Sequence, residues 1–155
     1  MTSIRPAALA AAIAVTLVFS TTPGEAQLGV NCSITTGGVA FGAYDVFSAA
    51  PVDAAGSVTY QCTLGASVVV QLGPGSAGTF TPRTLRRSGE PLNYNLYLDA
   101  ARTQVWGNGT SGTSTYSNFV TISFPVVVPI HARIFAGQNV TVGSYNDSVV
   151  ATIVF

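Results

Sequence analysis

The residues of this chain that could carry out chemistry are few and scattered. Beyond residue 26, the acidic and imidazole side chains are Asp45, Asp53, Glu90, Asp99, Asp147 and His131. Hydrolysis usually needs a base beside a nucleophile or a pair of carboxylates. Asp53, Glu90 and Asp147 stand in turn-like contexts, where capping and solvation are the common roles. His131 lies in an apolar run, which favours a structural role. We therefore predict no catalytic residue.

Cys32 and Cys62 are the two cysteines of the chain. In an oxidising compartment their even number predicts one disulfide, and two buried free thiols are the alternative. The disulfide would close a loop of about 30 residues and contribute about 3 to 4 kcal/mol on the chain-entropy model. Two sulfurs and His131 fall short of the four ligands of a structural zinc site. The segment Gly107-Asn108-Gly109 opens no expected helix, so we predict neither a metal nor a cofactor.

The first 26 residues have the layout of a secretory signal peptide. Arg5 precedes an apolar run at residues 6–19, and small residues follow at 20–26. The run has about 14 residues, fewer than the roughly 20 that a membrane-spanning helix needs. We expect cleavage after Ala26, with Ser20 as the alternative site. Residues 1–26 would then be the signal peptide, and residues 27–155 one exported domain without a membrane anchor.

Composition and periodicity both favour strands over helices. Of the six Arg and six acidic residues, Arg5 and Glu25 lie in the first 26 residues, which leaves five of each, and Lys is absent. This balance argues against a nucleic acid or an acidic membrane as partner. Alternating segments recur between turn signals, and no stretch has helical spacing over three turns. The pattern predicts an all-β sandwich with strands at 28–35, 39–44, 57–63, 67–72, 92–98, 119–127, 130–135, 139–142 and 148–155.

The aromatic residues allow two interpretations. Sugar-binding sites use aromatic side chains and neutral polar loops, and the residues available for such a platform are Tyr60, Tyr94, Tyr97, Trp106 and Tyr116. Core packing and cross-strand pairing are the alternative. We favour the core, because Tyr94 and Tyr97 fall on opposite faces of one expected strand, so that at least one of them points inward.

Short blocks spread over the exported part of the chain resemble a known family. They are Cys-Ser-Ile at 32–34, Val-Ala-Phe-Gly-Ala-Tyr at 39–44, Gly-Ser-Val-Thr-Tyr-Gln-Cys-Thr at 56–63, Arg-Thr-Leu at 83–85, Leu-Asn-Tyr-Asn-Leu-Tyr-Leu-Asp at 92–99, Val-Trp-Gly at 105–107 and the closing stretch 137–155. In this order and spacing they resemble the spore coat protein U domain. Leu85 departs from the pattern, because many relatives have Met there.

The resemblance implies an incomplete fold. The family is similar to subunits of archaic chaperone-usher pili, which are immunoglobulin-like, pilin-type β-sandwiches that lack one strand. A periplasmic chaperone and then the next subunit supply that strand by β-augmentation. Cys32 and Cys62 would join the first two strands. The last strand, in which Val149, Ala151, Ile153 and Phe155 share one face, would line the groove that accepts the donor, with these residues: Val149, Ala151, Ile153, Val154 and Phe155.

From this resemblance we expect a secreted structural subunit of a chaperone-usher pilus or a surface coat, with a role in adhesion or biofilm formation. Its partners would be a periplasmic chaperone, an outer-membrane usher and neighbouring subunits. The alternatives are a self-sufficient secreted coat protein and a carbohydrate-binding β-sandwich module. Cleavage after Ala26 would leave residues 27–31 ahead of Cys32, a donor arm that reaches roughly 17 Å. Such a short arm favours a subunit at the tip, which accepts a strand and gives none; cleavage at Ser20 would instead leave residues 21–31 as a poor donor.

Overall fold

The described part of the chain forms eight strands in two sheets. The computed structural model describes residues 29–121 and 124–155, and the expected signal peptide and donor arm lie largely outside these residues. No helix occurs in the described part of the chain. The five-stranded sheet has the order β1-β2-β7-β5-β4 and the three-stranded sheet the order β6-β3-β8. The strands are β1 (Cys32–Gly37), β2 (Val52–Cys62), β3 (Ala66–Leu72), β4 (Arg83–Arg87), β5 (Glu90–Tyr97), β6 (Tyr116–Val120), β7 (Val126–Ile134) and β8 (Ala151–Val154).

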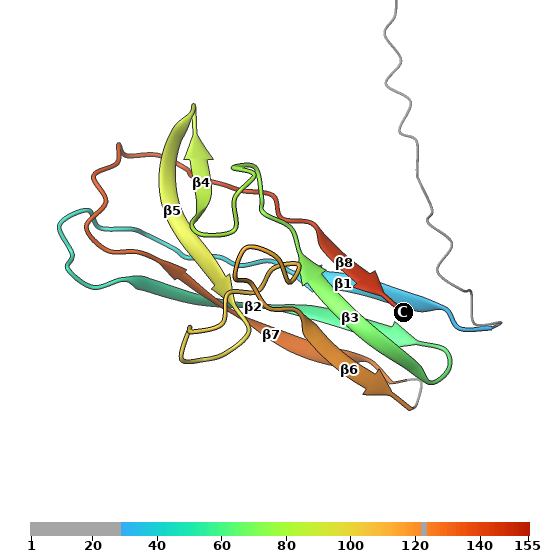
Figure 1. The fold of residues 1–155 in the computed structure, drawn as a ribbon. Coiled ribbons are helices and arrows are strands. Elements are labelled where there is room, and N and C mark those ends of the chain that lie inside the picture. The colour runs from blue at the N-terminus through green and yellow to red at the C-terminus, as the bar shows by residue number, and fades with distance from the viewer. Residues whose placement is uncertain (1–28, 122–123) are drawn as a thin grey trace, which may run out of the picture.

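The two sheets pack face to face around one apolar core (Figure 1). In β3, buried and more exposed residues alternate strictly, because successive side chains of a strand point to opposite faces. β2 and β7 contribute to the same core from the other sheet through Val58, Tyr60, Val128 and Ile130. All hydrogen-bonded neighbours in both sheets are antiparallel. The predicted all-β immunoglobulin-like sandwich is therefore confirmed.

The predicted disulfide is present between Cys32 and Cys62. The two residues are direct partners in the β1–β2 ladder, and their Cα atoms are 4.0 Å apart. β1 is an edge strand, and its other edge has no neighbour in the five-stranded sheet. The disulfide therefore ties the first strand to the body of the sheet.

Two expected strands are absent, and one strand was missed. Residues 39–44 and 139–142 are not in strands. β1 ends at Gly37 beside Gly56, where a Cβ atom would lie 2.9 Å from the carbonyl oxygen of Gly37 and 2.7 Å from Val39. This close approach requires a glycine at position 56, and the β1–β2 ladder ends at Gly37. The expected strand 119–127 is two strands, β6 and β7. β4 has the sequence Arg-Thr-Leu-Arg-Arg and escaped prediction because it lacks an apolar alternation.

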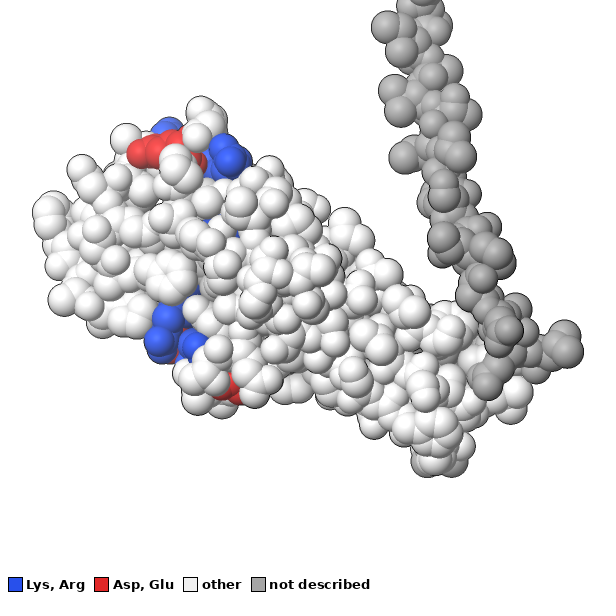
Figure 2. All heavy atoms as spheres, in the orientation of Figure 1, with Lys and Arg blue, Asp and Glu red and all other residues white. Residues whose placement is uncertain are grey.

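Charge divides the two sheets. The strands of the five-stranded sheet contain six charged residues, whereas the sequences of β3, β6 and β8 contain none. The six are Asp53, Arg83, Arg86, Arg87, Glu90 and Arg133. On the face drawn in Figure 2, blue and red spheres lie in the left part of the molecule, and the surface around the ends of β3, β6 and β8 is white.

Candidate strand-accepting groove

The C-terminal segment crosses from one sheet to the other. Asn146 exchanges two backbone hydrogen bonds with Arg86 of β4, with N···O distances of 2.8 and 3.2 Å. Four residues later the amide of Gly73 donates to the carbonyl of Val150 (2.8 Å), and β8 then pairs with β3. The chain therefore begins this segment at the edge of the five-stranded sheet and ends it at the edge of the three-stranded sheet.

A hollow opens beside the end of β1 and the start of β8. These two strands contact each other, each as the last strand of a different sheet, and the hollow lies between residues 36–41, at and after the end of β1, and residues 147–151, which lead into β8. The hollow has a volume of about 290 Å³. Its floor is the core itself, because buried Leu72, Leu96 and Ile130 line it. The core is thus reachable from outside at the place where a strand between residues 36–41 and residues 147–151 would cover it.

A second and larger hollow continues the first. It has a volume of about 790 Å³ and lies between residues 39–47 and residues 140–147. Both hollows are lined by Val39, Phe41, Leu85 and Asp147. We refer to the two together as the groove. The groove runs along the end of β1 and the residues after it on one side, and along the residues that lead into β8 on the other.

Hydrogen bonds to side chains hold both walls of the larger hollow. On one side the hydroxyl of Tyr44 donates to the carbonyl of Phe135 (3.0 Å) and accepts from the amide of Gln138 (2.8 Å). On the other side Glu90 accepts from the amide of Thr141 (3.0 Å) and from the hydroxyl of Tyr145 (2.6 Å). Hydrogen bonds from Thr141 and Tyr145 hold the pKa of Glu90 below its ordinary value. Each wall is fixed to β5 or to the end of β7 without entering a sheet.

Asp147 fixes the wall where the two hollows meet. Its carboxylate accepts hydrogen bonds from the hydroxyl of Tyr94 (2.6 Å) and from the amides of Ser76 and Ser148 (2.8 Å each). The capping role expected from the sequence is therefore present. Burial, and next the hydrogen bond to Asp147, raise the pKa of Tyr94, so its phenol stays protonated and keeps donating.

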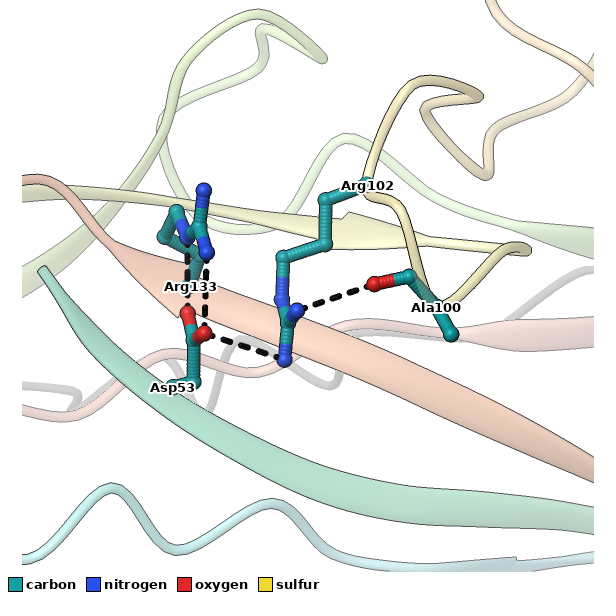
Figure 3. A network of polar contacts seen from close by, with 4 residues as sticks. All are labelled: Asp53, Ala100, Arg102 and Arg133. Carbon is teal, nitrogen blue, oxygen red and sulfur yellow. Dashed lines mark hydrogen bonds and ion pairs between the residues drawn. The ribbon is translucent and has the colours of Figure 1, made fainter.

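The other acids are bound to separate partners. Asp53 was expected in a turn, and this prediction was wrong, because it lies in β2 opposite Arg133 of β7. Arg133 donates to both oxygens of Asp53 at 2.7 and 2.9 Å, and Arg102 approaches to 3.2 Å (Figure 3). The hydrogen bond from Arg133 is the largest cause that lowers the pKa of Asp53. The carboxylate of Asp99 caps a loop, because it accepts hydrogen bonds from the amides of Thr103 and Gln104.

No residue cluster of the described chain has the make-up of a metal site. Among residues 29–121 and 124–155, no group of three or more His, Cys, Asp or Glu side chains is placed to hold a metal ion. His131 lies in β7, where it faces Ala55 of β2 and Tyr97 of β5 across the ladders. This position agrees with the structural role expected for it.

The aromatic residues belong to the core. Trp106 is completely buried, and its indole nitrogen donates to the carbonyl of Val70 (3.0 Å). Tyr60, Tyr94 and Tyr97 are also buried. Tyr116 packs its ring against Tyr60 and Trp106. A sugar ring could not stack on faces that are already covered, so the platform interpretation is wrong for the four buried residues, whereas Tyr116 is partly exposed.

Arg83 is a buried residue that sequence reasoning missed. Its side chain is fully buried and has no acidic partner within ion-pair distance in the described residues. The guanidinium donates to the carbonyls of Gly73 (2.8 Å) and Trp106 (2.7 Å) and to the side-chain oxygen of Asn95 (3.0 Å). The one signal in the sequence was its place at the start of an Arg-Thr-Leu block, which says nothing of burial.

The residues predicted to line the groove fall into two groups. Val149 and Ala151 line the smaller hollow, and Ile153 packs against the core. Val154 and Phe155 line neither hollow, and they are 50% and 53% exposed. The structure adds wall and floor residues that the sequence reading did not include: Gly37, Val39, Phe41, Leu72, Leu96 and Ile130.

Comparisons with known proteins agree with this geometry. The model of the spore coat protein U domain matches residues 16–152. The chain belongs to the spore coat protein U domain family. A curated relative, Protein U of Myxococcus xanthus, is 42% identical over 147 residues, which covers 84% of this chain and 80% of the relative. The family resemblance predicted from the sequence blocks is therefore confirmed.

A solved structure shares the fold. It is the chaperone-tip adhesion subunit pre-assembly complex CsuC-CsuE from archaic chaperone-usher Csu pili of Acinetobacter baumannii. The TM-score is 0.56 at 22% sequence identity, over 81% of this chain and 40% of the matched chain. The family member described here thus spans less than half of that chain, and the likeness concerns the pilin-type sandwich. In the described residues, no helix is long and apolar enough to cross a membrane.

Proposed function

We propose that this protein is a structural subunit of a chaperone-usher pilus or surface coat, exported through the periplasm and assembled by donor-strand complementation. A periplasmic chaperone would fill the groove first, and a strand of a neighbouring subunit would replace it at an outer-membrane usher. The assembled subunit would act in adhesion or biofilm formation at the cell surface. Family membership supports the coat or pilus, and the groove supports the mechanism.

The open core between β1 and β8 is the observation that carries the proposal. Leu72, Leu96 and Ile130 are buried residues, yet they form the floor of a hollow between two strand edges. An edge strand offers unpaired N–H and C=O groups to any extended chain. A donor strand would satisfy these groups and place alternate apolar side chains on the floor, which is how β-augmentation combines affinity with specificity.

The groove favours a particular donor. Among the described residues, Asp147 is the one charged residue that lines the smaller hollow, and its carboxylate is already bonded to Tyr94, Ser76 and Ser148. A charged donor side chain would therefore lose hydration there without gaining a free partner. The proposal predicts an extended, uncharged donor with apolar residues at every second position.

A self-sufficient coat protein of the same fold is the second candidate, favoured by the core that the two sheets already share. Periplasmic expression of the exported chain, with and without a pilus chaperone, separates the two. Donor-strand assembly predicts a one-to-one complex on gel filtration and aggregation or loss of the chain without the chaperone. A stable, soluble monomer obtained without a chaperone would instead favour the self-sufficient protein.

A matched pair of variants tests the groove directly. Ala151→Asp places a charge in the smaller hollow, whereas Thr152→Asp places it on the exposed side of the same strand. We expect Ala151→Asp to reduce chaperone capture at least tenfold, a loss of about 1.4 kcal/mol or more, and Thr152→Asp to leave it near that of the unchanged chain. Ala151→Leu fills the hollow without a charge and should also reduce capture. If the chaperone captured all three variants equally, β8 would have no part in accepting the donor strand.

A further inference from the structure

Four strands form the sheet edges of this protein, and three of them are accounted for. β1 and β4 end the five-stranded sheet, and β6 and β8 end the three-stranded sheet. β1 and β8 border the groove. β4 is covered in part, because Arg86 exchanges backbone hydrogen bonds with Asn146, and it carries Arg residues, which discourage a further strand. β6 remains.

The outer edge of β6 has no strand beside it in the described part of the chain. Natural edge strands are usually protected by Lys or other charges, by Pro, by bulges or by a covering segment. β6 has the sequence Tyr-Ser-Asn-Phe-Val, without charge or Pro, and it pairs with β3 residue by residue from Tyr116 to Val120. Its edge therefore lacks the sequence features that block the addition of another strand.

β6 is held in place from the inside and carries an exposed aromatic side chain on the outside. The amide group of Asn118 donates to the hydroxyl of the buried Tyr60 (3.0 Å). On the opposite face, beside Ser117, Phe119 is 63% exposed, and its ring lies near Gly65 in the segment that connects β2 to β3. The edge is thus presented by an anchored strand, with an aromatic side chain available for a cross-strand contact.

We propose that the edge of β6 pairs with β6 of a second copy of this chain, around a twofold axis at Asn118. In this antiparallel register all five residues find partners: Ser117 faces the second copy's Phe119, and Tyr116 faces the second copy's Val120. The pairing is isologous, so one surface serves both copies. Because β3, β6 and β8 carry no charge, two copies meet without like-charge repulsion.

The pairing joins the three-stranded sheets of two subunits into one sheet of the order β8-β3-β6-β6-β3-β8. It leaves β1 and β8 free, so it operates beside strand exchange in the groove and does not depend on it. Donor strands would connect subunits along a fibre, and β6 would connect them sideways. Sideways contacts are what a coat requires in addition to linear assembly.

Sedimentation of the exported chain at increasing concentration tests the pairing. We use Ser117→Lys, which adds a charge to the edge strand, and Ser67→Lys as its control, because Ser67 is exposed on the neighbouring β3 opposite Phe119. The unchanged chain and the Ser67 variant should form dimers, whereas the Ser117 variant should lose dimers at least tenfold. A chain that never dimerises, or two lysine variants that behave alike, would overturn the proposal. If Ala151→Asp removes the dimers, they form through the groove, which also overturns it.

Cysteine cross-linking tests the register. Chains with Ser117→Cys are mixed with chains with Phe119→Cys, since these two positions face each other in the proposed dimer. The mixture should form an intermolecular disulfide several times faster than either variant alone, because identical positions are diagonal and lie about 7 to 8 Å apart. Equal rates in the mixture and in the separate variants would exclude the register centred on Asn118.

Discussion

The five-stranded sheet contains six charged residues in its strands, and the three-stranded sheet contains none. In the charged sheet, Asp53 and Arg133 bind each other across β2 and β7, and β4 with its Arg residues closes one edge. In the uncharged sheet, β6 and β8 both present edges without charge. The comparison teaches that, of the four edge strands in the described chain, only β4 carries charge and is partly covered by Asn146, whereas β1, β6 and β8 carry none and are the edges that we propose to pair with another chain.

Removal of the buried guanidinium should have the largest effect on stability. Arg83→Met leaves the carbonyls of Gly73 and Trp106 without this donor, whereas the side-chain oxygen of Asn95 keeps the amide of Leu96. Since a buried polar group without a partner costs about 1 to 3 kcal/mol, the loss from the two carbonyls should be about 4 kcal/mol. Denaturant unfolding measures it.

Arg86→Met is the matched control on the same strand, because Arg86 is exposed and no hydrogen bond or ion pair of its side chain is present in the described residues. It should change the free energy of unfolding by about 0.5 kcal/mol or less. Similar losses of unfolding free energy for Arg83→Met and Arg86→Met would mean that the buried hydrogen bonds of Arg83 add nothing to stability and that charge in β4 serves only to protect its edge.

Loss of the disulfide should come next. β1 is the uncharged edge strand of the charged sheet, and Cys32 ties it to Cys62 of β2. Replacing both cysteines with Ser should destabilise the exported protein by about 3 to 4 kcal/mol on the chain-entropy model. Thermal melting under oxidising conditions provides the measurement. An unchanged melting temperature would show that packing alone holds β1.

The ion pair of the charged sheet should have the smallest effect. Arg133 lowers the pKa of Asp53, so the carboxylate stabilises the fold above the ordinary Asp pKa of about 3.9 and this contribution is lost as pH falls through the lower folded value. Asp53→Asn should cost about 0.2 to 1 kcal/mol at neutral pH, and less at high salt. The difference from the unchanged chain should vanish in acid.

Asp45→Asn is the control for this titration, because the Asp45 carboxylate accepts from the amide of Phe47 and is not in an ion pair in the described residues. Its effect should depend little on salt. Equal salt dependence for Asp45→Asn and Asp53→Asn would contradict a stabilising ion pair between β2 and β7.

Sequence reasoning succeeded where the signal is local. The alternation in residues 67–72 and 148–155 marks strands with one inward face, and the structure has β3 and β8 there. Sequence reasoning failed where a partner strand decides whether a segment becomes a strand. Residues 39–44 were also expected to form a strand, but they follow the end of the β1–β2 ladder at Gly37 and pair with no strand of the described chain. Because no neighbouring strand covers them, they line the groove.

The sequence by itself determined the all-β class, the disulfide between Cys32 and Cys62, the family and the inward positions of Val149 and Ala151. The class, the disulfide and the inward positions rest on residue type or on the twofold period of a strand, and the family rests on the order of short sequence blocks, all of which can be read along the chain. Only the tertiary structure decided that Arg83 is buried, that Asp53 binds an arginine 80 residues away, and that buried Leu72 and Ile130 form the floor of a groove. The reason is physical: which strand edges pair with each other depends on the order of the strands in the sheets, and that order differs from their order along the chain.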